Sequence, residues 1–233
     1  MDDRVGAAAG TVLVTGGASG LGAAVADAVA EAGGTPIVVD INEPATAHLF
    51  ERIDLADTRR AEQAVRDLVE RHGGLDGVVT CAAVDVPRDF ADLDGEMWER
   101  IVRVNLLGTA AVIRGALPSL RERGGRIVTV ASTLGLRALP AASAYCASKF
   151  GIVGMTRALM LELAGQVGVT LLLPGGMDTA FFDGRPDQFS PAPEQMLNDP
   201  ADVAAAVLFA LRQPPGCELR EMVVTPSVEP SWP

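Results

Sequence analysis

Tyr145 and Lys149 are the two residues whose chemistry and spacing first suggest a function for this sequence. Tyr145 is the only tyrosine and Lys149 the only lysine, and the other cationic side chains, apart from two histidines, are arginines. The apolar run at 150–164 contains no proline and predicts a helix, on which residues four apart share one face. An ammonium beside a phenol favours the phenolate and lowers its pKa below the ordinary value of about 10. The pair is therefore a candidate proton donor and acceptor, the alternative being a buried tyrosine beside a lysine stem.

A glycine-rich turn near the start of the chain suggests an anion-binding site. The β-branched run 11–14 is followed by the turn 15–22 and by an alanine-rich helical stretch at 23–32. Gly16, Gly20 and Gly22 would let backbone N–H groups at a helix N-terminus approach a pyrophosphate, because no Cβ stands in the way. Their spacing differs from the commoner G-x-G-x-x-G pattern, so the turn predicts a dinucleotide site only together with the strand that follows.

Asp40 ends that following strand, which is expected at 37–39. A carboxylate at this position can hold the two hydroxyls of an adenosine ribose. It would repel a 2′-phosphate, and the neighbouring residues 18, 19, 41 and 42 supply no cation. Asp40 therefore predicts NAD as the cofactor and makes NADP less favoured, the alternative being an acid that merely caps the strand.

Strands and helices alternate through the rest of the chain. Ligands bind α/β sheets beyond the carboxyl ends of the strands, and Gly16, Asp40, Asp54, Cys81, Ser132 and Pro174 all fall at such ends. Apolar strands that alternate with helices predict an α/β fold, in which helices cover both faces of a doubly wound, seven-stranded parallel sheet. The remaining strands are expected at 52–55, 77–81, 126–130, 169–173 and 218–225, and the remaining helices at 58–72, at 94–120, around Tyr145 and from Pro200.

The composition limits the class of protein and its partners. With 233 residues, 48% of them hydrophobic, the chain can bury one core, so a single domain, 1–233, is expected. A net charge of −11 would repel a phosphate backbone, which excludes nucleic acid as a partner. Cys81, Cys146 and Cys217 lack metal-type spacing, so neither a metal site nor a disulfide is expected. The acidic start, 1–4, and the lack of an apolar stretch of about 18 residues predict a soluble, cytoplasmic protein without a membrane partner.

Several motifs together resemble the short-chain dehydrogenase/reductase family over essentially the whole chain. The family's T-G-x-x-x-G-x-G turn is met at 15–22, its Y-x-x-x-K at Tyr145 and Lys149, its serine at Ser132, its helix asparagine at Asn105, its adenine-contacting aspartate at Asp54, and its P-G-x-x-x-T at Pro174, Gly175 and Thr179. The chain departs from the family at Thr80-Cys81-Ala82-Ala83, where N-N-A-G is usual. The resemblance implies a Rossmann-type fold, and cofactor binding is expected to survive this departure, at most in weaker form.

The resemblance also implies roles for the catalytic candidates. Tyr145 would be the general acid and base, and Lys149 would lower its pKa and bind the nicotinamide ribose. Ser132 would donate a hydrogen bond to the substrate oxygen, and Asn105 would hold a water that relays protons from Lys149. Taken alone, Ser132 fits a strand-end turn and Asn105 fits a locally satisfied helix residue equally well.

The binding residues follow from the same comparison. The cofactor site is expected to comprise Gly16, Ser19, Gly20, Leu21, Gly22, Asp40, Asp54, Leu55, Cys81, Ala82, Ala83, Tyr145, Lys149, Pro174, Gly175, Met177 and Thr179. The substrate site is expected to comprise Ser132, Leu134, Tyr145, Gly176, Phe181 and Phe182, beneath a mobile lid at 180–198. Arg88, Arg137 and Arg185 could hold an acidic group, but a solvated position is the expectation for each. Leu134, Leu136 and Leu139 favour core or subunit contacts.

These expectations combine into a hypothesis with two alternatives. The chain is predicted to be an NAD-dependent oxidoreductase that interconverts a secondary alcohol and a ketone. The alternatives are a non-catalytic dinucleotide-sensing or scaffolding protein on the same fold, and an NADP-linked 3-oxoacyl-thioester reductase. The resemblance implies a homodimer or homotetramer formed through the 94–120 and Tyr145 helices, with the tail 228–233 in a second contact.

Overall fold

Seven parallel strands form the centre of the protein. A computed structural model describes residues 9–232. The strand order is β3-β2-β1-β4-β5-β6-β7, and each neighbouring pair is parallel. The predicted doubly wound sheet is thereby confirmed. The strands are β1 (Thr11–Thr15), β2 (Thr35–Asp40), β3 (Leu49–Arg52), β4 (Gly77–Thr80), β5 (Arg126–Val130), β6 (Gly168–Pro174) and β7 (Glu221–Val224).

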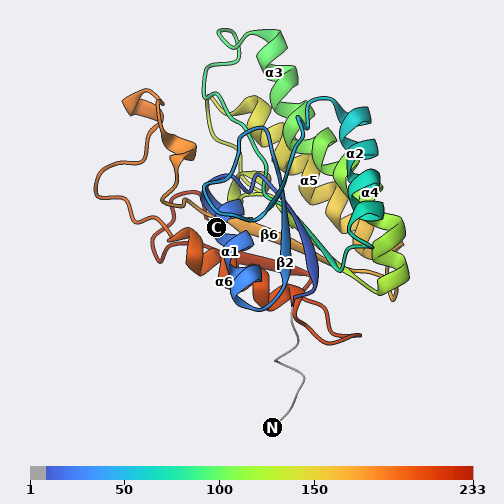
Figure 1. The fold of residues 1–233 in the computed structure, drawn as a ribbon. Helices are drawn as coiled ribbons and strands as arrows, with labels where there is room; N and C mark the ends of the chain where they lie inside the picture. Colours follow the sequence, from blue (N-terminus) through green and yellow to red (C-terminus); the bar gives the residue numbers. More distant parts are fainter. Residues whose placement is uncertain (1–8, 233) are drawn as a thin grey trace.

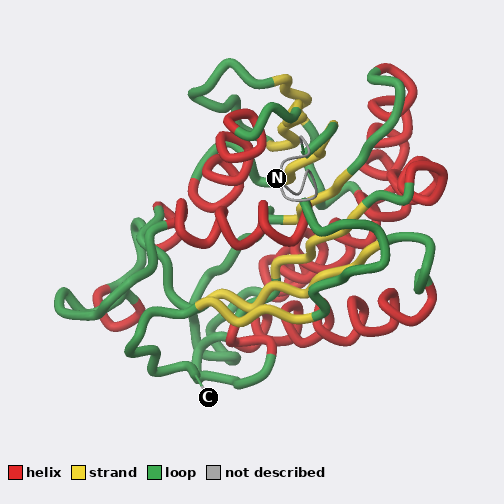
Figure 2. The backbone as a smooth tube through the Cα atoms, turned by 90° about the horizontal axis from the view of Figure 1, so that it is seen from below, coloured by secondary structure: helices red, strands yellow, loops and turns green. Residues whose placement is uncertain are grey.

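Helices cover both faces of this sheet. Figure 1 shows α1 and α6 on one face and α2, α4 and α5 on the other, and Figure 2 shows helices on either side of the strand layer. Asp57 and Asp199 cap the first turns of α2 and α6 by accepting hydrogen bonds from backbone N–H groups, which explains where these helices begin. The helices are α1 (Gly20–Glu31), α2 (Thr58–Arg71), α3 (Gly95–Val102), α4 (Thr109–Arg123), α5 (Ser143–Glu162) and α6 (Pro200–Leu211).

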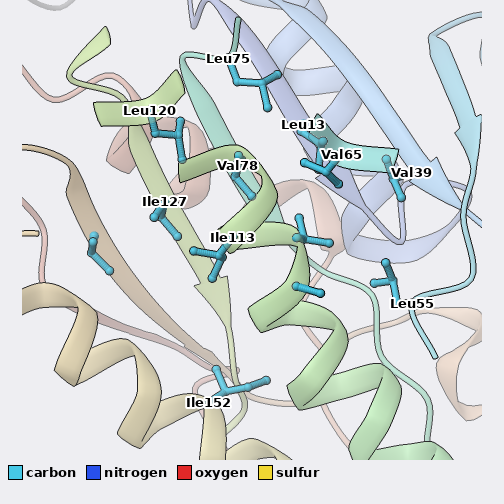
Figure 3. Close-up of a cluster of buried hydrophobic side chains, with 14 of the residues drawn as sticks. Leu13, Val39, Leu55, Val65, Leu75, Val78, Ile113, Leu120, Ile127 and Ile152 are labelled. Atoms are coloured by element: carbon cyan, nitrogen blue, oxygen red, sulfur yellow. The ribbon is translucent and has the colours of Figure 1, made fainter. Parts of the chain in front are cut away.

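The core lies in two layers because successive strand residues point to opposite faces. Val12 and Val14 of β1 pack with α1 and α6, whereas Leu13 packs with α2 and α4. Figure 3 shows the second layer, in which Val78 of β4 and Ile127 of β5 face α4. Burial on both faces explains why the strands read as continuous apolar runs rather than as alternating ones.

Two predicted elements are wrong in position or regularity. The third strand is Leu49–Arg52 rather than 52–55, because Asp54 accepts a hydrogen bond from the Ala56 N–H and turns the chain into α2. The single helix expected at 94–120 is three consecutive segments, α3, the π-helical turn η2 (Arg103–Gly108) and α4. Such π-helical turns occur frequently at functional sites.

The helical run 95–123 is the longest helical stretch among the described residues. It is long and apolar enough to span a membrane by composition, with a mean hydropathy of 1.3 in its most apolar window. In that window, 56% of the residues are buried inside the fold, as in the core helix of a globular domain. The acidic start at 1–4 lies outside the described residues.

Candidate active site

A cleft of about 600 Å³ opens beyond the carboxyl ends of the strands. A volume of this size is typical of sites that hold small ligands or cofactors. It extends from the end of β2, across the turn after β1, to the ends of β5 and β6. Every residue predicted to bind cofactor or substrate lines this cleft, and of the predicted catalytic residues Ser132, Tyr145 and Lys149 also do so. Asn105 does not line it.

The glycine turn fits a pyrophosphate. Gly16 has φ +70°, and a Cβ there would lie 2.7 Å from the Cα of Ala82 on the neighbouring strand's loop. A Cβ on Gly22 would lie 2.1 Å from the carbonyl oxygen of Gly16. Ser19, the N-cap of α1, makes no capping hydrogen bond with its side chain, so the first N–H groups of this helix remain available to an anion.

Asp40 occupies the position expected for a ribose-binding carboxylate. Its Oδ2 accepts a hydrogen bond from the Ala18 N–H at 3.1 Å, and its Oδ1 accepts one from the Asn42 N–H at 2.9 Å. Each oxygen has a second lone pair that can accept a ribose hydroxyl. These backbone bonds hold the carboxylate at the edge of the cleft.

Arg52 is a cation near this carboxylate that the sequence reading missed. It pairs in register with Asp40 on the neighbouring strand, and its guanidinium donates to the carbonyl oxygen of Ile41. A strand expected at 52–55 places Arg52 at its first residue, which is the edge of the sheet opposite to Asp40. In the structure Arg52 is the last residue of β3 and lies at the same edge as Asp40. Arg52 does not itself line the cleft, but a guanidinium is the group that would bind a 2′-phosphate at this edge.

Tyr145, Lys149 and Ser132 are brought together as predicted. Ser132 follows β5; its hydroxyl accepts a hydrogen bond from the Leu134 N–H at 3.1 Å and lies near enough to the phenol of Tyr145 to lower its pKa. Lys149 lies one helical turn after Tyr145, with its Nζ 5.4 Å from the centre of the phenol ring. The same ammonium donates to the carbonyl oxygen of Val130 at 2.9 Å. The strand end and the helix together therefore orient one hydroxyl, one phenol and one ammonium in the cleft.

The electrostatics of the pair differ from the prediction. Burial raises the pKa of Tyr145, the carboxylate of Asp85 raises it further, and the hydrogen bond from Ser132 and the charge of Arg185 oppose this rise. Burial lowers the pKa of Lys149 to about 8, and the carboxylate of Asp85 opposes part of this shift. The pKa of Tyr145 is therefore raised rather than lowered as expected, because desolvation of the phenol outweighs the effects of Ser132 and Arg185.

Asn105 is a positioning residue in the π-helical turn. Its Oδ1 accepts a hydrogen bond from the Val84 N–H at 2.8 Å, and its Nδ2 donates to the Val84 carbonyl at 2.9 Å and to Ser148 Oγ at 3.1 Å. The side chain thus ties the loop after β4 to α5, which rules out the alternative of a locally satisfied helix residue. That Asn105 also holds a relay water stays a prediction.

The departure at 80–83 leaves the loop after β4 braced in another way. The Thr15 hydroxyl accepts a hydrogen bond from the Ala82 N–H at 3.2 Å, which links this loop to β1. The Thr80 hydroxyl is buried and has no hydrogen-bond partner. Burial raises the pKa of the Cys81 thiol to about 12, against the charge of Lys149, so the thiol stays protonated at neutral pH.

The far end of the cleft is largely apolar. The ring of Phe181 lies 5.8 Å from that of Tyr145 and 5.7 Å from that of Phe182. Leu134 and Leu139 also line the cleft, so these two leucines are not core residues, although Leu136 does not line it. The predicted lid, in orange in Figure 1, contains two short 3-10 helices, Ala180–Phe182 and Asp187–Phe189.

Sequence reasoning missed one charged residue at this end and misplaced another. Asp85 and Arg185 form an ion pair, Oδ2 to Nη2, at 3.1 Å, with side chains only 7% and 11% exposed. The expectation of a solvated Arg185 is therefore wrong. The sequence does contain a signal for Asp85, because this acid follows an apolar strand and a short apolar loop and so falls at the carboxyl end of the sheet, where ligands bind.

The C-terminal tail also closes part of the cleft. Glu229 accepts a hydrogen bond from the Gly176 N–H at 2.8 Å and others from the backbone N–H and hydroxyl of Ser231. Ser231 in turn hydrogen-bonds Thr133 Oγ1 at 2.6 Å. Hydrogen bonds from Gly176 and Ser231 lower the pKa of Glu229 against the effect of burial. The tail thereby holds the Gly176 segment that follows β6.

Comparisons with known proteins identify the family of the chain. The family model described as short chain dehydrogenase matches residues 10–188. The chain is 33% identical over 216 residues to the 2,5-dichloro-2,5-cyclohexadiene-1,4-diol dehydrogenase of Sphingobium indicum, covering 84% of this chain and 86% of that protein. It is 33% identical over 238 residues to the glycine betaine reductase of Emericella nidulans, covering 94% of this chain but only 19% of that protein's length.

A solved structure shows the same fold. The aldohexose dehydrogenase of Thermoplasma acidophilum matches with a TM-score of 0.83 at 22% identity, covering 93% of this chain and 92% of that one. The sheet, the cleft and the sequence matches together place the chain in the short-chain dehydrogenase/reductase family. It is an oxidoreductase of that family, which uses a nicotinamide dinucleotide as its cofactor.

Proposed function

We propose that the protein is an NAD-dependent oxidoreductase that interconverts a secondary alcohol and a ketone. The observation that carries this proposal is the convergence of Ser132, Tyr145 and Lys149 on one cleft with a pyrophosphate-type glycine turn. The match to a diol dehydrogenase supports alcohol oxidation as the reaction. A sensing or scaffolding protein would have no use for a proton-transferring phenol in this place.

The chain's own residues would perform the proton transfer and the binding. When bound, the nicotinamide supplies the hydride acceptor or donor. Tyr145 takes the alcohol proton or returns it, and Ser132 donates a hydrogen bond to the substrate oxygen as negative charge develops there. Lys149, held by the Val130 carbonyl, places a positive charge beside the phenol and within reach of a ribose hydroxyl.

The cofactor's ribose would bind at Asp40, with Asp54 and Leu55 at the adenine end. The two backbone N–H groups that hold Asp40 leave its outer lone pairs for a ribose diol, which favours NAD. Arg52 is the observation that favours NADP as a second candidate, and with it the thioester reductase. A titration of the protein with NADH and with NADPH decides between them, and tighter NADPH binding would contradict the proposed role of Asp40.

Tyr145→Phe tests the catalytic assignment. Secondary alcohols would be screened for the appearance of NADH absorbance, and the variant should lose about 10²- to 10⁴-fold in kcat/KM, the range for a general acid–base group. NADH affinity should change little. Thr156→Val is the matched control, since it removes a buried hydroxyl from the same helix at a site that does not line the cleft. Turnover by Tyr145→Phe close to that of the control would refute the assignment.

We also propose a cytoplasmic homodimer or homotetramer. Phe150 and Leu161 of α5 are 45% and 81% exposed, which supports the contact implied by the resemblance. Analytical ultracentrifugation of the wild type and of Leu161→Glu would test it, and a monomeric wild type would contradict it.

A further inference from the structure

Asp85 and Arg185 form a buried polar feature within the largely apolar end of the cleft. The guanidinium carbon of Arg185 lies 4.6 Å from the centre of the Phe181 ring and 4.9 Å from that of Phe182. Its Nε donates to the Phe181 carbonyl at 3.2 Å, and its Nη2 lies 3.1 Å from Asp85 Oδ2. Stacking and hydrogen bonding thus orient the guanidinium, and both members of the pair line the cleft.

This pair lies close to the reacting groups. The charges of both Asp85 and Arg185 act on the phenol of Tyr145, and that of Asp85 also acts on Lys149. Phe181, on which the guanidinium stacks, lies 5.8 Å from the Tyr145 ring. A small substrate with its reacting oxygen at Tyr145 would therefore present its next substituents to the pair.

The pair has hydrogen-bonding capacity left for a ligand. Arg185 Nη2 is buried, and its one polar contact is the ion pair with Asp85 Oδ2 at 3.1 Å, which leaves a further N–H of this nitrogen without a partner among the described residues. Each carboxylate oxygen of Asp85 has lone pairs beyond the one that faces Arg185, so the carboxylate can accept further hydrogen bonds. A buried donor without a partner is costly, and a ligand group that satisfies it gains that cost back in affinity.

The neutral charge of the pair indicates the kind of group that fits. A substrate carboxylate or ammonium would have to separate Asp85 from Arg185 and leave one of them buried without its counter-ion, which is strongly unfavourable. A hydroxyl can donate to the carboxylate and accept from the guanidinium without disturbing either charge. The ring faces of Phe181 and Phe182 would cover the apolar carbons beside it.

We propose that Asp85 and Arg185 form a subsite for a second hydroxyl group of the substrate, so that the protein prefers diols and polyhydroxylated rings to mono-alcohols. This inference rests on the proposed function, since it names the substrate class of the same site. It also assigns a specificity-determining role to a residue of the lid segment.

The test compares cyclohexanol with cis- and trans-1,2-cyclohexanediol in the wild type. A site built to bind a hydroxyl discriminates strongly against an analogue that lacks it, so at least one diol should have a kcat/KM about tenfold or more above that of cyclohexanol. The double variant Asp85→Leu/Arg185→Met removes both charges together and leaves neither uncompensated. Its preference for the diol should fall to about onefold to threefold, as expected when an apolar wall replaces the hydrogen bonds.

Controls separate this effect from general damage to the lid. The control double variant Asp187→Leu/Arg121→Met makes the same changes at exposed positions that do not line the cleft, and it should keep the wild-type preference. Circular dichroism verifies that each double variant is folded. If Asp85→Leu/Arg185→Met does not fold, Arg185→Gln is tested in its place. The preference of this variant for the diol over cyclohexanol should also fall, because the guanidinium donor is lost although the Asp85 carboxylate remains.

The outcomes distinguish the inference from the proposed function. Oxidation of cyclohexanol without any preference for a diol would overturn the inference and leave the function standing. A preference for 3-hydroxybutyrate over both diols would also overturn it, since Arg185 would then bind a carboxylate. Failure to oxidise any alcohol, or to reduce the corresponding ketones, with either coenzyme would overturn the proposed function and the inference together.

Discussion

Replacing Asn105 by alanine should destabilise the protein by about 3 kcal/mol. The side chain is fully buried and makes three hydrogen bonds, two with the backbone of Val84 and one with Ser148. Each such bond contributes about 1 kcal/mol net, and alanine would leave the polar groups of Val84 and Ser148 without their partner. In a domain of this size about 1 kcal/mol corresponds to about 2–4 °C, so Tm should fall by roughly 6–12 °C.

Urea unfolding followed by far-ultraviolet circular dichroism measures this loss. The slope of the transition should be unchanged, since the variant removes bonds without changing the surface exposed on unfolding. NADH affinity should fall as well, because the loop that Asn105 holds lies beside the glycine turn. Asn42→Ala, at an exposed asparagine, is the control for stability and should change it by less than about 0.5 kcal/mol. A loss for Asn105→Ala as small as that of the control would refute the bracing role.

Three further predictions concern the turn and the two titrating groups. Gly22→Ala should abolish NADH binding and cost about 1–3 kcal/mol in a urea titration, because its Cβ would meet the Gly16 carbonyl. Tyr145 is the only tyrosine, so phenolate absorbance reports the titration of this residue alone. At pH 10, the ordinary pKa of a phenol, the folded protein should show no phenolate. The stability of the protein should fall above pH 10, because the folded state keeps a proton that the unfolded state loses. Phenolate appearing below pH 10 would contradict this. Burial lowers the pKa of Lys149 to about 8, so between about pH 8 and 10 the unfolded state binds more protons at this residue than the folded state does. The free energy of unfolding of the wild type should therefore rise over that range relative to that of Lys149→Met. Parallel pH profiles of stability for the two proteins would refute the lowered pKa of Lys149.

The sequence alone determined the sheet, the glycine turn and the convergence of Ser132, Tyr145 and Lys149. These features follow from local patterns, namely apolar strands between helices, glycines at close approaches and a four-residue spacing on a helix. Once parallel strands are assigned, their carboxyl ends must meet at one edge, and so the residues that follow them come together.

Only the tertiary structure decided the position of β3, the burial of Arg185 and the place of Glu229 in the cleft. It also reversed the expected shift in the pKa of Tyr145, since the spacing to Lys149 reveals an attraction but not the loss of water around the phenol. Desolvation and buried ion pairs depend on which segments far apart in the sequence cover a group. Asp85 and Arg185 are 100 residues apart in sequence, and only the folded chain brings their charges into contact.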